Sequence, residues 1–197
     1  MKKILVLGLV IMLLVLAAAP VQAGKHSFAV AWSLSLPTGN TYDFSRNLCW
    51  RGINVDYLYF YRPTLAWGVN AGYSIFVQND GNTYYGDNFA VTSDRWTYIN
   101  AVPIFLNVQK IWGDKKKSQI FAGLNGGTAW VEQKMTVGIH ATKNTRWLFG
   151  FAPELGYNFN PDIWLDYASL RYNYFFESGD MEAQSWLELR LGFRFGL

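Results

Sequence analysis

Two histidines, His26 and His140, are the residues of this 197-residue chain best suited to act as a general base. A hydrolase or acyltransferase of the serine type needs such a histidine beside a serine and a carboxylate. His26 lies near the start of the chain, and His140 has Glu132 and Thr142 nearby but no His-x-Ser arrangement around it. The sequence therefore predicts no catalytic residue, and catalysis by His140 is the weaker alternative.

No metal or cofactor site is expected either. Cys49 is the single cysteine, so it can form neither an intramolecular disulfide nor a zinc or redox motif. The acidic segment 79–94 lacks the residue spacing of a calcium loop, so it favours a solvated turn over a cation site. The run Lys-Lys-Lys at 115–117 is expected to keep a turn soluble, with contact to lipid head groups as the weaker alternative.

Six charged residues fall inside stretches in which apolar and polar residues alternate. Three are acidic and three are basic, and all share the polar register of their stretch. A set enclosed inside a barrel must be paired, because an isolated charge away from water is costly. We expect a plug of ion pairs in the barrel interior (the lumen), with a narrow gated pore as the alternative. The six residues are Asp56, Glu154, Arg171, Glu188, Arg190 and Arg194.

Alternation with a period of two, from Ser27 onward, predicts the strands that must position these charges. The last strand is the clearest, since its odd-numbered residues from Leu187 to Phe195 are all apolar. We count eight such stretches of about ten residues, the length that a tilted membrane-spanning strand needs. The fold class predicted is all-β, an eight-stranded antiparallel up-and-down barrel. Long polar connections are expected at about 37–49, 79–94, 132–146 and 177–184, and short turns at 62–64, 113–117 and 160–162.

The apolar register could face either a soluble core or membrane lipid. The polar register is rich in Gly, Ala, Ser and Asn and carries almost no Lys or Glu in mid-strand, which suits a narrow lumen better than a solvent-facing surface. The alternation of long and short connections also favours a transmembrane barrel. Tryptophans near strand ends on the apolar register predict aromatic girdles at the bilayer interfaces. Those assigned to the outer interface are Trp96, Trp130 and Trp147, and those assigned to the inner one are Trp67, Trp112 and Trp164.

Two further tryptophans at strand ends, Trp50 and Trp186, lie on the polar register and are not assigned to the girdles.

Composition agrees with a β-barrel: 51% of residues are hydrophobic, yet the mean hydropathy is only +0.03. That value is too low for several apolar helices of about 20 residues each. An aromatic content of 18% with 16% charged residues also excludes a disordered chain.

Residues 1–23 have the features of a cleaved signal peptide. Lys2 and Lys3 precede an apolar run, and Val21-Gln22-Ala23 supplies the small residues of a cleavage site. The run is short for a membrane span, so an anchor is the weaker alternative. The remaining 24–197 are expected to form one exported domain. Without the leader the chain has 15 basic and 14 acidic residues, and a net charge of +1 argues against a nucleic-acid partner.

The chain resembles the outer-membrane β-barrel domain superfamily, the small eight-stranded barrels of Gram-negative bacteria. The resemblance covers 24–197 and rests on the leader, the alternating strands, and the segments AVPIFLN at 101–107, FAGLNGG at 121–127 and FAPELG at 151–156. The chain departs from the pattern at its end, since Gly196-Leu197 stand where such barrels usually have a terminal aromatic residue.

The resemblance implies a place in the bacterial outer membrane, both mature termini in the periplasm, and contact with outer-membrane lipid and lipopolysaccharide. We expect a non-enzymatic protein without cofactors, structural or interacting with an extracellular ligand or surface through its loops, and monomeric. Some similar barrels modify lipid A, so an enzyme acting on lipid A or phospholipid at the membrane rim is one alternative. A narrow small-solute channel and a soluble periplasmic barrel that binds a hydrophobic ligand are the others.

Overall fold

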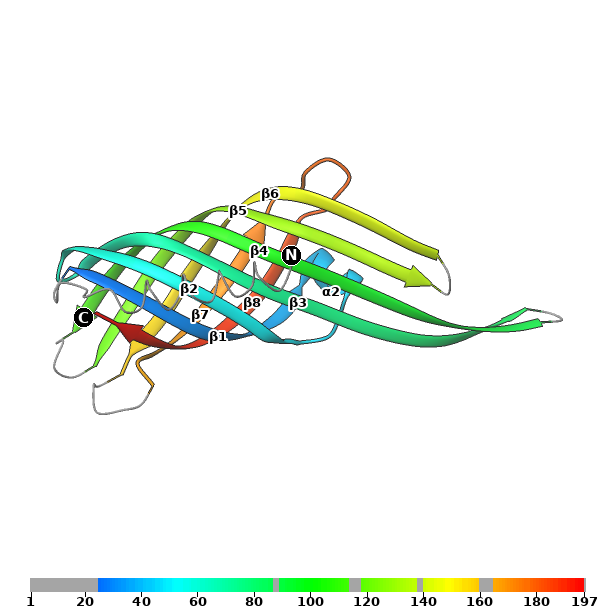
Figure 1. Ribbon diagram of the computed structural model, residues 1–197, viewed down its shortest axis with the longest axis horizontal. Helices are drawn as coiled ribbons and strands as arrows, with labels where there is room; N and C mark the ends of the chain where they lie inside the picture. The colour runs from blue at the N-terminus through cyan, green and yellow to red at the C-terminus, as the bar shows by residue number, and fades with distance from the viewer. Residues whose placement is uncertain (1–24, 87–88, 114–117, 138–139, 160–164, 197) are drawn as a thin grey trace, which may run out of the picture.

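The described part of the chain forms one closed barrel of eight antiparallel strands (Figure 1). The computed structural model describes residues 25–86, 89–113, 118–137, 140–159 and 165–196, with backbone only at 81–86, 89–94 and 140. Each strand pairs with its neighbours in sequence, and β1 pairs with β8 to close the sheet. The predicted eight-stranded up-and-down barrel is confirmed. The elements are β1 (His26–Thr38), α2 (Gly39–Phe44), β2 (Cys49–Arg62), β3 (Leu65–Gly86), β4 (Phe89–Gly113), β5 (Gln119–Val137), β6 (His140–Asn158), β7 (Tyr167–Phe175) and β8 (Gln184–Phe195).

Some of the sequence predictions, including the short turn at 160–162, fall outside the described residues. The others are the signal peptide at 1–23, the lysine run at 115–117, and the girdle residue Trp164. Over the part of the chain that is described, no helix is both long enough and apolar enough to cross a bilayer.

Side chains alternate strictly between the two faces of the sheet. In β1 and β7 every second residue is buried, and the buried residues belong to the polar register identified in the sequence. Large apolar side chains such as Trp32, Leu106 and Phe149 are exposed on the outer face. The reason is the two-residue period of a strand, which sends one register into the lumen and the other outward.

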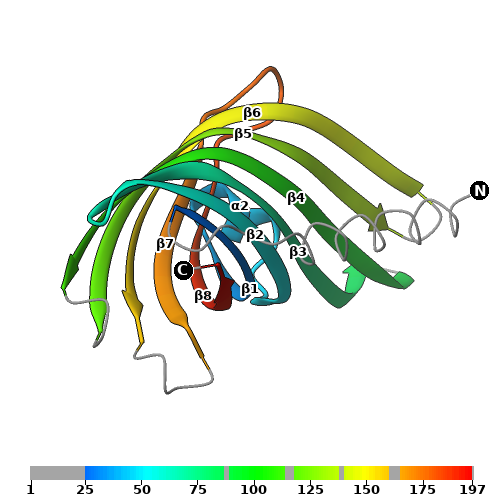
Figure 2. The same cartoon turned by 60° about the vertical axis from the view of Figure 1, so that its left-hand side comes forward.

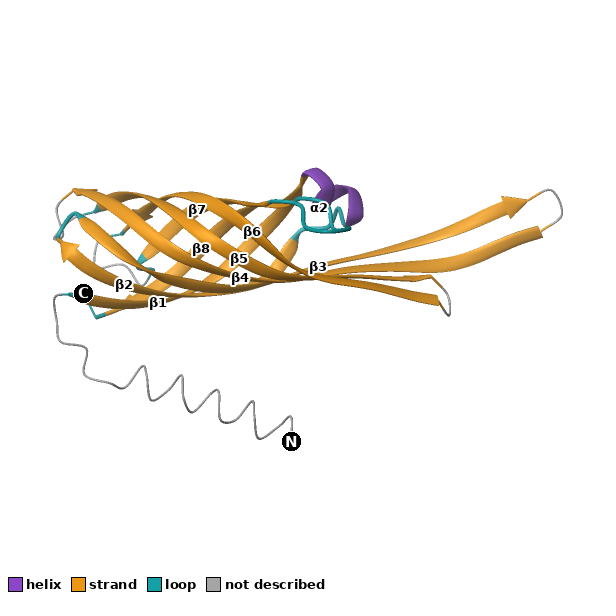
Figure 3. Ribbon diagram, turned by 90° about the horizontal axis from the view of Figure 1, so that it is seen from above, coloured by secondary structure: helices purple, strands orange, loops and turns teal. Residues whose placement is uncertain are grey.

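The two ends of the barrel differ. Short connections join β2 to β3, β4 to β5 and β6 to β7 at one end, called here the turn end, where the described chain also begins and ends (Figure 2). At the opposite end, called here the hairpin end, α2 lies at the mouth of the barrel (Figure 3). There the Thr41 hydroxyl donates to Gln184 Oε1 at 3.0 Å and accepts from the Ser185 amide at 2.9 Å.

Two segments expected to be long loops are β-hairpins instead. β3 and β4 pair without a break from Ser74↔Ala101 to Gly86↔Phe89, and β5 and β6 remain paired up to Val137↔His140. β4 and β5 also stay paired as far as Arg95↔Val137, so the four strands project past the barrel as one sheet (Figure 3). This corrects the expected strand length of about ten residues, since β3 and β4 have 22 and 25. The projecting part of β3 and β4 also contradicts the solvated turn expected within 79–94.

Candidate functional site

Inward side chains fill the lumen in three layers. Near the hairpin end lies an apolar cluster that includes Phe76, Phe105, Phe175 and Trp186. Phe175 stacks on both Phe105 and Trp186, with ring centroids 5.6 Å and 5.2 Å apart, and Phe76 meets Trp186 edge-on. The polar layer follows next along β7 and β8, and a second apolar cluster lies beyond it toward the turn end. The buried hydrophobic members of that second cluster are Ala29, Ala31, Leu58, Phe60, Ala66, Ile111, Phe121 and Tyr167.

The first ion pair of the polar layer joins Arg171 on β7 to Glu188 on β8. Both side chains are fully buried, and Arg171 Nη2 lies 2.7 Å from Glu188 Oε2. The same guanidinium donates to the amide oxygens of Asn54 and Asn70, each at 2.8 Å. Glu188 in turn accepts from the side-chain amides of Asn54, at 2.7 Å, and Asn173, at 2.9 Å. Neutral amides therefore complete the hydrogen bonding of a pair that water does not reach, as a buried pair requires.

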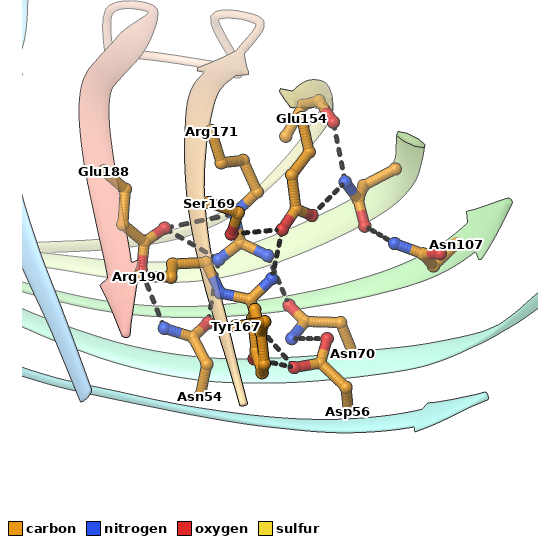
Figure 4. Close-up of polar contacts among 12 residues, drawn as sticks. Asn54, Asp56, Asn70, Asn107, Glu154, Tyr167, Ser169, Arg171, Glu188 and Arg190 are labelled. Carbon is orange, nitrogen blue, oxygen red and sulfur yellow. Dashed lines mark hydrogen bonds and ion pairs between the residues drawn. The ribbon is translucent and has the colours of Figure 1, made fainter. Parts of the chain in front are cut away.

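The second group places Arg190 of β8 between two carboxylates, Asp56 of β2 and Glu154 of β6 (Figure 4). Arg190 Nη1 lies 2.8 Å from Glu154 Oε1, and Nη2 contacts Asp56 Oδ2. The Tyr167 hydroxyl donates to Asp56 at 3.2 Å, and the Ser169 hydroxyl donates to Glu154 at 2.6 Å. One cation thus serves two buried anions, and hydroxyl groups satisfy part of the remaining carboxylate lone pairs.

Hydrogen bonds between amides connect the two groups into one network. The Asn70 amide accepts from Arg171 and donates to Asp56 Oδ1 at 2.8 Å. Asn125 of β5 donates to Glu154 at 3.3 Å and accepts from Asn107 of β4, and Asn54 donates to Ser33 of β1 at 3.1 Å. The network therefore includes at least one residue from each of the eight strands.

Arg194, the sixth charge expected in the lumen, lies closer to the turn end and makes no ion pair with the described carboxylates. Its Nη1 donates to Asn158 Oδ1 at 3.0 Å, and its guanidinium carbon lies 4.9 Å from the centre of the Tyr167 ring. Tyr167 itself was not picked out in the sequence. The available signal was its register, since it shares the inward face of β7 with Ser169 and Arg171. Gly192 makes room for its ring, because a Cβ there would lie 2.5 Å from the ring.

The other candidate residues form no catalytic or metal-binding arrangement in the described chain. His26 Nδ1 lies 2.7 Å from the Tyr57 hydroxyl on the outer face near the turn end. Cys49 is buried, and its sulfur accepts the Ile75 amide at 3.3 Å. The described residues contain no group of three or more His, Cys, Asp or Glu side chains that could hold a metal ion. The side chain of His140 lies outside the described set.

The described girdle tryptophans all lie on the outer face, toward the ends of the barrel. Trp67 and Trp112 are exposed near the turn end, and Trp96 and Trp147 are exposed toward the hairpin end. Trp130 is partly buried and pairs directly with Trp147 across β5 and β6. Their place at the bilayer interfaces stays a prediction.

Comparison with known proteins identifies the family. The outer membrane protein beta-barrel domain family matches residues 10–195. The chain belongs to this family. As an outer membrane protein beta-barrel domain it is a protein of the bacterial outer membrane, and the apolar outer face of its strands is the face turned to lipid. No curated protein matches the chain.

Among solved structures, the domain is similar to neisserial surface protein A, NspA, with 12% identity, a TM-score of 0.56, and 89% of this chain and 99% of that chain covered. It is also similar to Ail, the attachment invasion locus protein of Yersinia pestis, solved with the heparin analogue sucrose octasulfate. There the identity is 19% and the TM-score 0.43, over 87% of this chain and 97% of that one. The likeness to NspA shows the same fold and carries no more than that.

Proposed function

We propose that this protein is a sealed, non-enzymatic outer-membrane barrel that presents the projecting sheet of β3 to β6 to molecules outside the cell. In this proposal 1–23 is a cleaved leader, 24–197 is one domain, and the turn end with both mature termini faces the periplasm. The observation that carries it is the continuous pairing of four strands past the mouth of a barrel whose interior is filled. A lumen built for passage would need open space, and eight strands leave room for little beyond side chains.

The projecting sheet has two chemically different hairpins. The segment 79–94 contains three aspartates and no basic residue, whereas 132–146 carries a net charge of +2. Hydrogen bonding between 95–100 of β4 and 132–137 of β5 joins the two hairpins at their bases, and 79–94 extends beyond that contact. A rigid surface with two oppositely charged parts suits selective contact with another macromolecule, because complementary charge governs both the encounter and the choice of partner.

The sealed lumen predicts that the purified protein does not conduct. Trp186 in the apolar cluster and Arg171 and Arg190 in the polar layer are each at most 1% exposed, so an ion meets a packed apolar barrier and a layer of buried ion pairs. We expect no stable unit conductance in planar bilayers at protein concentrations where a trimeric porin gives clear steps. Reproducible steps that scale with the amount of folded protein would show that the lumen is a channel.

Shortening each hairpin tests whether the projecting sheet of β3 to β6 contacts molecules outside the cell. Asp80 and Arg95 are cross-strand partners, so an Asn-Gly turn can replace 81–94 and close β3 onto β4. Gln133 and Asn144 are likewise partners, and the same turn can replace 134–143. We expect both variants to fold, by their shift on a heat-modifiability gel, because the lumen residues are untouched. Cells expressing a shortened protein should adhere several-fold less to surfaces coated with extracellular matrix proteins than cells expressing the full hairpins. Equal adhesion would contradict the proposed role of the sheet.

A further inference from the structure

The outer faces of β4, β5 and β6 near the hairpin end form a regular grid of side chains. Backbone pairing places Val102, Trp130 and Trp147 in one row across the three strands. Two residues further toward the hairpins the row is Asn100, Glu132 and Thr145, and the next row is Tyr98, Lys134 and Lys143. The residues of these rows share one face, because side chains of a strand repeat every second residue.

Two lysines stand directly opposite each other in the third row. Lys134 and Lys143 are cross-strand partners, and like charges in that position destabilise a sheet. Glu132 offsets only one of them: its Oε2 lies 2.5 Å from Lys143 Nζ, while Lys134 has no ion pair among the described residues. The lysine pair therefore leaves an uncompensated positive charge on an exposed surface, with the Lys143 side chain 59% exposed.

The position of the lysines relative to the tryptophans indicates what could neutralise them. Tryptophan side chains, such as those of Trp130 and Trp147, are enriched at membrane–water interfaces. Lys134 lies four residues beyond Trp130 on β5, which is about 13 Å along the strand. For a strand tilted by about 45°, this places Lys134 roughly 9 Å further from the bilayer centre along the membrane normal. Lysine side chains reach back along apolar surface toward head groups. Both ammonium groups can therefore reach the level at which lipid head groups carry their phosphates.

We propose that Lys134 and Lys143, with the stacked rings of Trp96 and Tyr98 beside them, form a binding site for the phosphorylated sugar head group of an outer-leaflet lipid, that is, a lipid A type of ligand. The rings of Trp96 and Tyr98 lie 6.0 Å apart at an angle of 11° and border the lysine row on β4. Phosphate supplies the missing negative charge, and aromatic faces suit the sugar. The proposal rests on the orientation given under the proposed function, with the hairpin end outside, and not on the adhesive role of the sheet.

The test uses the purified mature protein in detergent, so that its result does not depend on orientation in a cell. Native mass spectrometry would compare binding of bisphosphorylated lipid A, monophosphorylated lipid A and phosphatidylethanolamine. We expect the wild type to prefer the bisphosphorylated form. The variant Lys134→Gln/Lys143→Gln should bind that form roughly thirtyfold more weakly, from the contribution of two basic residues near a lipid surface. The matched control is Lys25→Gln/Lys110→Gln, which removes two exposed charges at the turn end and should bind as the wild type does.

Other outcomes would overturn the proposal. Equal loss in the control would show a general effect of net charge, and unchanged binding by the Lys134/Lys143 variant would exclude the site. If millimolar inorganic phosphate displaces the lipid, the surface recognises a free anion rather than a lipid.

Melting curves separate an effect on binding from an effect on folding. Without lipid, the Lys134→Gln/Lys143→Gln variant should be at least as stable as the wild type, and lipid A should raise the melting temperature of the wild type only. A variant that melts lower without lipid would assign the lysines to the fold.

Discussion

Replacement of Arg190 by Met is expected to lower the free energy of unfolding by about 4 kcal/mol, because it leaves two buried carboxylates without their cation. Arg190 is the cation of both Asp56 and Glu154, and all three side chains are buried away from solvent. Methionine has a similar length and fills most of the same volume, so packing changes little. Urea titration of the protein folded into lipid vesicles would measure the loss.

Two further variants assign that loss to charge. Arg62→Met removes an exposed arginine at the turn end, and it should unfold at nearly the wild-type urea concentration. Adding Asp56→Asn and Glu154→Gln to Arg190→Met should recover much of the lost stability, since the two carboxylates that lost their cation are then neutral. If Arg190→Met behaves as Arg62→Met does, or if the added substitutions only worsen it, the paired lumen does not stabilise the barrel as described.

Replacement of Trp186 by Ala is expected to cost about 3 to 5 kcal/mol through the cavity it leaves. The ring is fully buried, stacks on Phe175, and meets Phe76 edge-on with centroids 5.7 Å apart. Its Nε1 has no hydrogen-bond partner in the described chain, so the loss reports packing alone. Trp186→Phe keeps a ring in place and should lose less than half as much. The measurement is the same urea titration in vesicles.

The matched control is Trp50, the other tryptophan on the polar register at a strand end. It is 58% exposed, so Trp50→Ala should cost about 1 kcal/mol or less. A similar loss for both tryptophans would mean that Trp186 does not pack as the structure shows. Both tryptophans lie on the polar register of the sequence, yet only Trp186 points into the lumen.

Much of this fold could be read from the sequence because one local rule governs it. The two-residue period located the strands and separated lumen from lipid, and the same register placed Glu188 and Arg190 inside. The partners of these charges were beyond such reasoning. Arg190 on β8 meets Asp56 on β2, with β1 between the two strands, so the pair depends on closure of the barrel between β1 and β8.

The projecting hairpins were missed for a different reason. The segments 79–94 and 132–146 contain Asn, Asp, Gly and Thr, which are typical of turns. Those residues still form strands here because each strand has a long-range partner already aligned by the barrel below it. Local composition carries no information about that alignment.

The polar network that includes residues from all eight strands also constrains how the barrel can be assembled. Asn54 and Asp56 on β2 bond to Arg171 and Arg190 on the last two strands, so these bonds form only when the first and last parts of the chain meet. A partly built sheet would expose both unpaired strand edges and unpaired charges, and hydrocarbon tolerates neither. Insertion into the bilayer and closure of the β1–β8 seam are therefore expected to occur as one concerted event, late in biogenesis.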